Sequence, residues 1–132
     1  MAGLLACSCG GGSTVTVELN EWKIVPDVTS VSAGEVTFVA DNKGEDRHEL
    51  VLLKTDLAMD KLPLDANGDV DEEGEGVKAV AEVEDIEPGK TGEFTAKLEP
   101  GNYALICNLA EPEGGMTEHH YALGMRSAFK VK

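Results

Sequence analysis

Side chains that bind soft metals stand in two places in this sequence. Cys107, the adjacent pair His119 and His120, and Met125 gather near the C-terminus, and His48 stands far upstream. A thiolate and a thioether favour Cu(I), whereas imidazoles also accept Cu(II). Two histidines and a cysteine in a trigonal plane, with a weak axial methionine, are the ligands of copper electron-transfer sites. These residue types therefore predict a candidate copper site that contains Cys107.

Cys107 could have a role other than that of a copper ligand. A buried cysteine is usually a small hydrophobic side chain. A catalytic thiol would need separated His and Asn partners, yet Asn108 adjoins Cys107 and no protease-like CGSCW setting surrounds it. A zinc site would more often have four strong ligands. A dinuclear copper site needs two bridging cysteines, and only one cysteine lies outside the N-terminal tail. We expect a metal ligand, and a protein that is not an enzyme.

The rest of the chain shows the pattern of an all-β protein. Short runs rich in Val, Thr, Ile and Phe are separated by turn-like breaks such as SAGE, DNKGED, EPGK and EPGN. The pattern predicts eight strands, near residues 15–19, 21–25, 34–40, 49–54, 77–83, 92–98, 101–107 and 126–131. Eight short strands favour an antiparallel sandwich or barrel. Residues 55–62, TDLAMDKL, are predicted to form a turn or two of helix.

Strand alternation predicts where two candidate ligands lie. Side chains two residues apart share a face, so His48 shares a face with Leu50, and Cys107 with Leu105. If the leucines face the core, both candidate ligands end rows of core-facing side chains. They then meet at one pole of the sandwich if their strands are close.

The N-terminus suggests export from the cytoplasm. The run from Leu4 to Cys7, LLAC, resembles the lipobox of bacterial lipoproteins, in which the cysteine is lipidated. Because only six residues precede Cys7, we expect a chain cut from a longer precursor. We predict a tether over residues 1–13, a domain over 14–132, and a place in the periplasm or at the cell surface, where a lipid would hold the protein peripherally to the membrane.

The charge excludes one class of partner. The chain has 132 residues, 25 acidic and 11 basic, and a formal net charge of −14. Such a surface repels phosphate backbones, so we expect no nucleic-acid binding. A basic partner or a salty habitat fits this charge.

An acidic segment interrupts the strands between residues 55 and 76. Asp65, Asn67, Asp69 and Asp71 have the spacing of a calcium loop. An EF-hand also needs glycine at its sixth position and glutamate at its twelfth, and those places hold Val and Gly here. We therefore expect residues 65–75 to be a solvated acidic loop.

Three stretches resemble the cupredoxin family of blue-copper proteins, which includes plastocyanin, azurin and halocyanin. They are SAGEVTFVADNKGEDRHELVLL, EPGNYALICN and HYALGMRSAFKV. The resemblance covers nearly all of residues 14–132 and implies a Greek-key β-sandwich. It implies that His48, Cys107, His120 and Met125 bind one copper ion. Of the adjacent histidines, His120 is chosen over His119 because HYALGM aligns with the family only through His120.

The resemblance also implies a function. A cupredoxin moves single electrons between proteins such as a cytochrome c and an oxidase or reductase. The electron is expected to leave through the exposed edge of His120, inside an apolar collar of Leu109, Ala122 and Leu123. We expect a monomer. The alternative is a copper-binding or copper-delivery protein outside the cytoplasm that does not shuttle electrons.

Two departures from the family pattern bear on the site. Twelve residues, 108–119, separate Cys107 from His120, where many cupredoxins have two to four. Residues 109–118 should therefore bulge from the metal end as an acidic flap, which could steer a basic partner. Glu49 follows the first histidine in place of the usual Asn or Ser, so a backbone N–H would have to bond the thiolate.

The sequence also predicts the places of three further residues. His119 is predicted to be an exposed loop residue, and Met116 is the second choice for the axial ligand. Trp22 is expected to pack on the core near the N-terminal hairpin rather than to join a redox path.

Overall fold

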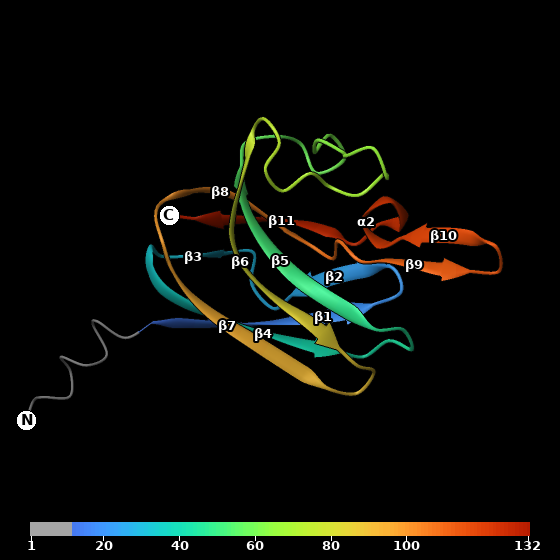
Figure 1. Cartoon of the computed structure of the whole chain (residues 1–132). Helices are drawn as coiled ribbons and strands as arrows, with labels where there is room; N and C mark the ends of the chain where they lie inside the picture. The colour runs from blue at the N-terminus through green and yellow to red at the C-terminus, as the bar shows by residue number, and fades with distance from the viewer. Residues whose placement is uncertain (1–11) are drawn as a thin grey trace, which may run out of the picture.

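Two β-sheets face each other in the computed structural model, which describes residues 12–132 (Figure 1). The predicted lipidation site Cys7 and most of the predicted tether lie outside these residues. The first sheet has the order β2-β1-β4-β7, with β1 (Ser13–Asn20), β2 (Lys23–Pro26), β4 (Gly34–Asn42) and β7 (Thr91–Leu98). The second has the order β3-β11-β8-β5-β6, with β3 (Ser30–Val31), β5 (His48–Thr55), β6 (Val77–Ile86), β8 (Gly101–Ile106) and β11 (Arg126–Val131).

Two short elements lie between β8 and β11. A hairpin of β9 (Ala110–Glu113) and β10 (Met116–His119) projects from the sandwich, as Figure 1 shows, and α2 (His120–Leu123) follows it directly. The hairpin is the predicted flap. It closes where the His120 N–H donates to the Leu109 carbonyl at 2.9 Å, so the flap ends at a predicted ligand.

The sequence prediction of an all-β sandwich is confirmed. All eight predicted strands are present, with ends shifted by a few residues. Most neighbouring strands are antiparallel, but β1 pairs with β4, and β3 with β11, in parallel. The helix predicted over residues 55–62 is wrong. Thr55 ends β5, its Oγ1 accepts the N–H of Leu57 at 3.0 Å, and only one turn follows, from Lys61 N to Ala58 O.

The main core lies between the two sheets. Alternate residues of β1 (Val15, Val17 and Leu19) are fully buried there. Leu50 and Leu105 face the same core, which confirms the alternation predicted for β5 and β8.

A second apolar cluster covers the outer face of β5 and β8. Val51 and Ile106 belong to it, and the segment between β5 and β6 together with α2 packs over them through Leu62, Val70 and Tyr121. Strand β5 is therefore buried on both faces.

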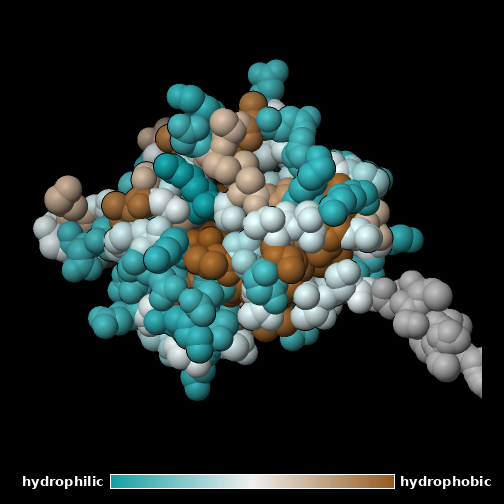
Figure 2. Space-filling view, turned by 180° about the vertical axis from the view of Figure 1, so that it is seen from behind, coloured by the Kyte–Doolittle hydropathy of each residue, from teal (hydrophilic) through white to brown (hydrophobic). Residues whose placement is uncertain are grey.

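The surface is mostly polar. Figure 2 shows hydrophilic side chains over much of one face, with small hydrophobic patches between them. Among residues 12–132, no helix is long and apolar enough to cross a membrane.

Candidate metal centre

Three predicted ligands meet at one end of the sandwich. His48 is the first residue of β5, Cys107 directly follows β8, and His120 begins α2. Because β5 and β8 are antiparallel neighbours, the start of β5 lies beside the end of β8. All three side chains are fully buried, and their ligand atoms lie within 4.8 Å of one another. The predicted meeting of His48 and Cys107 at one pole is confirmed.

The distances fit a trigonal metal centre. Cys107 Sγ lies 3.8 Å from His48 Nδ1 and 3.5 Å from His120 Nδ1. Metal bonds of about 2.1 Å to nitrogen and about 2.3 Å to sulfur, at an angle of about 120°, put the two ligand atoms about 3.8 Å apart. The three side chains are thus arranged for one ion with little rearrangement.

Met125 joins this group from the C-terminal side. Its side chain is fully buried in the same core cluster as Cys107. Its carbonyl accepts the Cys107 N–H at 3.2 Å, and its N–H donates to the His120 carbonyl at 3.1 Å. Met116, the second choice for the axial ligand, is 74% exposed on β10. Of these two methionines, only Met125 has the burial that a ligand of this centre needs.

The sulfur of Cys107 accepts a backbone hydrogen bond. The Glu49 nitrogen lies 3.3 Å from Sγ, so the backbone N–H of the residue after His48 donates to the sulfur, as the sequence required. Burial raises the pKa of the Cys107 thiol to about 12. Without a cation the thiol keeps its proton at neutral pH, and a metal ion must displace that proton.

The second nitrogen of His48 is held by a carboxylate. Glu21 Oε2 lies 2.6 Å from His48 Nε2, and the Glu21 carboxylate also accepts the N–H groups of Glu45 (2.8 Å) and Asp46 (3.2 Å). Although burial opposes the shift, these hydrogen bonds lower the pKa of Glu21. An ionised Glu21 places the imidazole proton on Nε2 and leaves the Nδ1 lone pair free for a metal. Sequence reasoning missed Glu21, which no motif links to a histidine 27 residues away.

His120 does not have the exposed edge that the resemblance implied. Its side chain is fully buried, which lowers its pKa, so that prediction is wrong. The ring of Trp22, at the turn between β1 and β2, packs edge-on against it with centroids 4.9 Å apart. Trp22 packs on the core as predicted. Its ring also lies edge-on to the ring of His48, with the two centroids 6.3 Å apart. The turn can come this close because residue 124 is glycine: a Cβ there would lie 2.8 Å from the Trp22 carbonyl oxygen.

Two more predictions concern the surroundings of His120. The predicted collar does not surround an exposed His120 edge, because His120 is buried; Ala122 and Leu123 are exposed on α2, and Leu109 is half-buried against the core. The prediction that His119 is an exposed loop residue is wrong. It is half-buried on β10, and its Nδ1 lies 2.7 Å from Asp69 Oδ1.

The acidic segment is therefore fastened to the metal end of the molecule. Asp65 Oδ1 accepts the N–H groups of Asn67 and Asp69, so it folds the loop on itself. Asn108 holds the same segment by bonds to both backbone groups of Val70.

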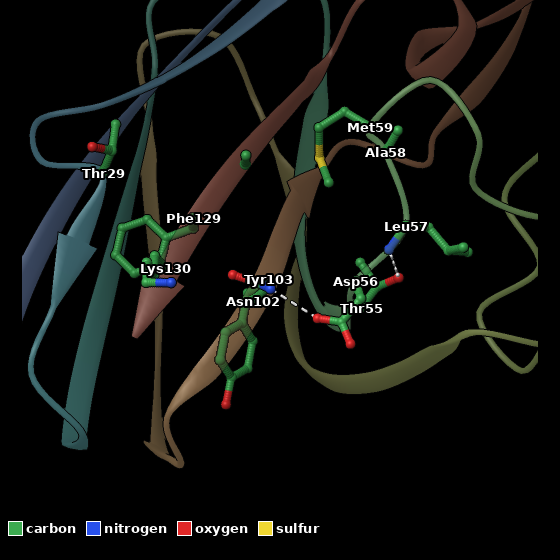
Figure 3. A pocket seen from close by; sticks show the side chains of 11 residues that line it. Thr29, Thr55, Asp56, Leu57, Ala58, Met59, Asn102, Tyr103, Phe129 and Lys130 are labelled. Atoms are coloured by element: carbon green, nitrogen blue, oxygen red, sulfur yellow. Dashed lines mark hydrogen bonds between the residues drawn. The ribbon is translucent and has the colours of Figure 1, made fainter. Parts of the chain in front are cut away.

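A pocket lies away from the candidate metal centre. It has a volume of about 320 Å³ and is lined by residues such as Thr29, Met59, Tyr103 and Phe129 (Figure 3). None of the four predicted ligands lines it.

A family model described as a cupredoxin-like domain matches residues 10–117, which include His48 and Cys107. A relative named iron uptake system component EfeO, from Yersinia pestis, is 31% identical over 104 residues, or 78% of this chain and 22% of the relative. The same component from Escherichia coli K12 is 29% identical over 101 residues, or 76% of this chain and 21% of the relative. The chain thus spans about a fifth of the length of these relatives.

Solved structures share the fold. Auracyanin A, described as a "blue" copper protein from Chloroflexus aurantiacus, is 22% identical with a TM-score of 0.57, over 92% of this chain and 100% of that one. Reduced rusticyanin is 19% identical with a TM-score of 0.58, over 92% and 81% of the two chains. Auracyanin from Roseiflexus castenholzii is 18% identical with a TM-score of 0.55, over 92% and 96%.

Proposed function

This chain belongs to the cupredoxin-like family, and from that premise we propose that it is a type 1 copper protein that carries single electrons between redox proteins. One observation carries the proposal. The two Nδ1 atoms of His48 and His120 and the sulfur of Cys107 converge, fully buried, at distances that suit a trigonal copper centre. Met125, buried in the same core cluster as Cys107, would supply a thioether to the ion.

Copper in this site would supply one-electron exchange between Cu(II) and Cu(I). The protein contributes a fixed set of ligands. Glu21 orients His48, and the Glu49 N–H bonds the thiolate of Cys107. Because the ligand side chains are packed in the core, they cannot move far when the charge of the ion changes. A rigid site of this kind favours electron transfer, and we propose no catalytic turnover of its own.

Trp22 is the electron path in this proposal, which replaces the expectation from the sequence that it would take no part in one. The His120 ring is buried, but the half-exposed indole of Trp22 packs on it and extends to the surface. The partner is a basic redox protein, such as a cytochrome c, an oxidase or a reductase, since the protein has a net charge of −14.

Adding one equivalent of Cu(II) tests the site. The expected result is an intense thiolate-to-copper band in the visible spectrum and a copper paramagnetic resonance signal with small hyperfine splitting. The control Cys107→Ala should lose the band while it keeps the fold by circular dichroism. A colourless wild-type protein would exclude the copper–thiolate centre.

A second candidate is a metal-binding or copper-delivery protein without a shuttle role. The full burial of His120 favours it, as does the similarity to relatives named as iron uptake components. Electron self-exchange and copper loss to a chelator discriminate the two. Fast self-exchange with slow loss supports the carrier, and the reverse supports delivery.

The place of work is also part of the proposal. We propose that the protein acts outside the cytoplasm, in the periplasm or at the cell surface, and is anchored through a lipid on Cys7, in the run that resembles a lipobox. Mass spectrometry of the protein from its natural membrane tests the anchor: a mature N-terminus at Cys7 that carries acyl groups is expected.

A further inference from the structure

A second group of metal-binding side chains lies beside the first. Ligand atoms of Asp46, Glu118 and His120 lie within 4.8 Å of one another. Asp46 is in the turn before β5, Glu118 is on β10 of the flap, and His120 begins α2. Three segments that are distant in sequence therefore bring two carboxylates to one imidazole. Both carboxylates are half-buried, and the imidazole is fully buried.

The imidazole of His120 has one nitrogen without a partner. Nδ1 lies 3.5 Å from Cys107 Sγ, so Nε2 is the ring nitrogen that remains for a further ligand. Within residues 12–132, Nε2 is the one buried side-chain nitrogen or oxygen without a hydrogen-bond partner. Buried polar atoms are nearly always paired, so an unpaired one indicates an absent ligand or a functional role.

The two carboxylates have no cation of their own. In the described part of the chain, neither side chain takes part in an ion pair, and the nearby Arg47 is bound to Glu111 and Asp85. The ligand oxygens of Asp46 and Glu118 lie within 4.8 Å of each other, so the two carboxylates repel each other when both are ionised. A bound cation would remove this repulsion and give the free nitrogen a partner.

We propose that Asp46, Glu118 and His120 Nε2 bind a second cation outside the copper site. When copper also occupies Nδ1, His120 bridges the two ions as an imidazolate, and the proton of its ring N–H is released to solvent. Two carboxylate oxygens and one imidazole suit a divalent cation such as Zn²⁺, Fe²⁺ or Mn²⁺ better than soft Cu(I). The outer site does not depend on copper, whereas the sharing of His120 rests on the proposed function.

Zn(II) is the probe, because it accepts nitrogen and oxygen ligands, has no redox chemistry and binds more weakly than Cu(II). In calorimetry, copper-loaded protein should bind one equivalent of Zn(II). The affinity should fall about tenfold or more in Glu118→Gln, relative to Glu113→Gln on the same hairpin, which removes the same charge. Asp46→Asn should show the same loss relative to Glu45→Gln. Zn(II) should also shift the thiolate-to-copper band of the wild type.

The same four substitutions in a Cys107→Ala chain separate the two proposals. If the wild type binds no copper but the Glu118→Gln and Asp46→Asn losses persist in this series, the outer site stands and the copper centre fails. If Glu118→Gln binds Zn(II) as tightly as Glu113→Gln, or if no Zn(II) binds, the outer site is overturned whether or not copper binds. Circular dichroism confirms that each variant is folded.

Discussion

The two histidines of the centre differ in what lies behind them. His48 has Glu21 on its second nitrogen, while the second nitrogen of His120 has no hydrogen-bond partner among residues 12–132. A carboxylate fixes the tautomer and makes the imidazole a stronger donor to a metal. We therefore assign His48 as the more firmly held ligand of the pair, and His120 as the one that responds to its surroundings.

Glu21→Gln tests this assignment. Gln keeps the shape but offers one acceptor oxygen to the three N–H donors that Glu21 now serves. Copper affinity, measured by competition with a chelator, should fall about tenfold or more. The matched change Glu18→Gln, at an exposed position of β1, should leave it unchanged. Equal affinities in both variants would show that Glu21 does not position His48.

Glu49 predicts how stability depends on pH. Burial, followed by repulsion from Glu82 and Glu72, raises its pKa from 4.5 to about 7. Between these two values the folded protein binds more protons at this site than the unfolded chain, so stability falls as pH rises from about 4.5 to 7. In metal-free protein, Glu49→Gln should remove this fall and add at most about 3 kcal/mol at pH 8.

Denaturant unfolding of the metal-free protein between pH 4 and pH 9 measures this effect. The variant and the wild type should have equal stability at the acid end and diverge toward neutral pH. The exposed Glu93→Gln serves as the control and should follow the wild type. A gap that is independent of pH would contradict the buried-carboxyl explanation.

Sequence reasoning selected the candidate ligands that the fold brings together, but not their environment. Cys107 and His120 could be predicted because their types and local sequences carry the signal. Glu21 and Trp22 act through contacts between the first hairpin and the metal end, and strand periodicity contains no information about such contacts. The burial of His120 could not be predicted either, because it depends on how closely a separate turn approaches.

At the scale of elements, the turn between β1 and β2 covers the site. It delivers Glu21 to His48 and Trp22 to His120. Its approach depends on Gly124, which has φ of 131° and no side chain to meet the Trp22 carbonyl. The contact of this turn with the end of α2 therefore controls access to the buried imidazole.

Gly124→Ala tests this contact. A Cβ at 124 would lie 2.8 Å from the Trp22 oxygen, so either the turn or α2 must move. Gly34 is a matched control, since its φ is 130° and a Cβ there meets nothing within 4 Å. Gly124→Ala should cost about 1–3 kcal/mol more than Gly34→Ala in chemical unfolding. It should also quicken copper loss to a chelator, and equal losses in both variants would exclude the covering role.

Eight of the nine strands in the two large sheets could be predicted because alternation and turn residues mark them, and the exception is the two-residue β3. The hairpin β9–β10 could not, since its strands, AEPE and MTEH, are polar and hold one β-branched residue between them. Its pairing places Glu118 opposite Glu111. Like charges at a cross-strand pair oppose hairpin formation, so contacts such as that of His119 with Asp69 must hold it.

At the scale of the whole molecule, charge opposes folding. Fourteen excess negative charges lie on one small sandwich. At about 10 mM salt the screening length is about 30 Å, so charges across the molecule repel one another, whereas at 0.15 M it is about 8 Å. The midpoint of thermal unfolding of the metal-free protein should therefore rise with NaCl. Glu73→Gln combined with Glu75→Gln, both exposed, should reduce the rise, and a midpoint independent of salt would contradict the self-repulsion argument.

The same charge predicts how partners are selected. Salt should slow electron exchange with a basic redox protein, because it screens the attraction that speeds their encounter. Salt should quicken exchange with an acidic one for the opposite reason. Stopped-flow rates over a range of NaCl concentrations, with both partners, measure the two slopes. Slopes of opposite sign would show that the net charge causes the effect. Equal slopes would mean that salt acts on the protein itself, and the acidic surface would then have no steering role.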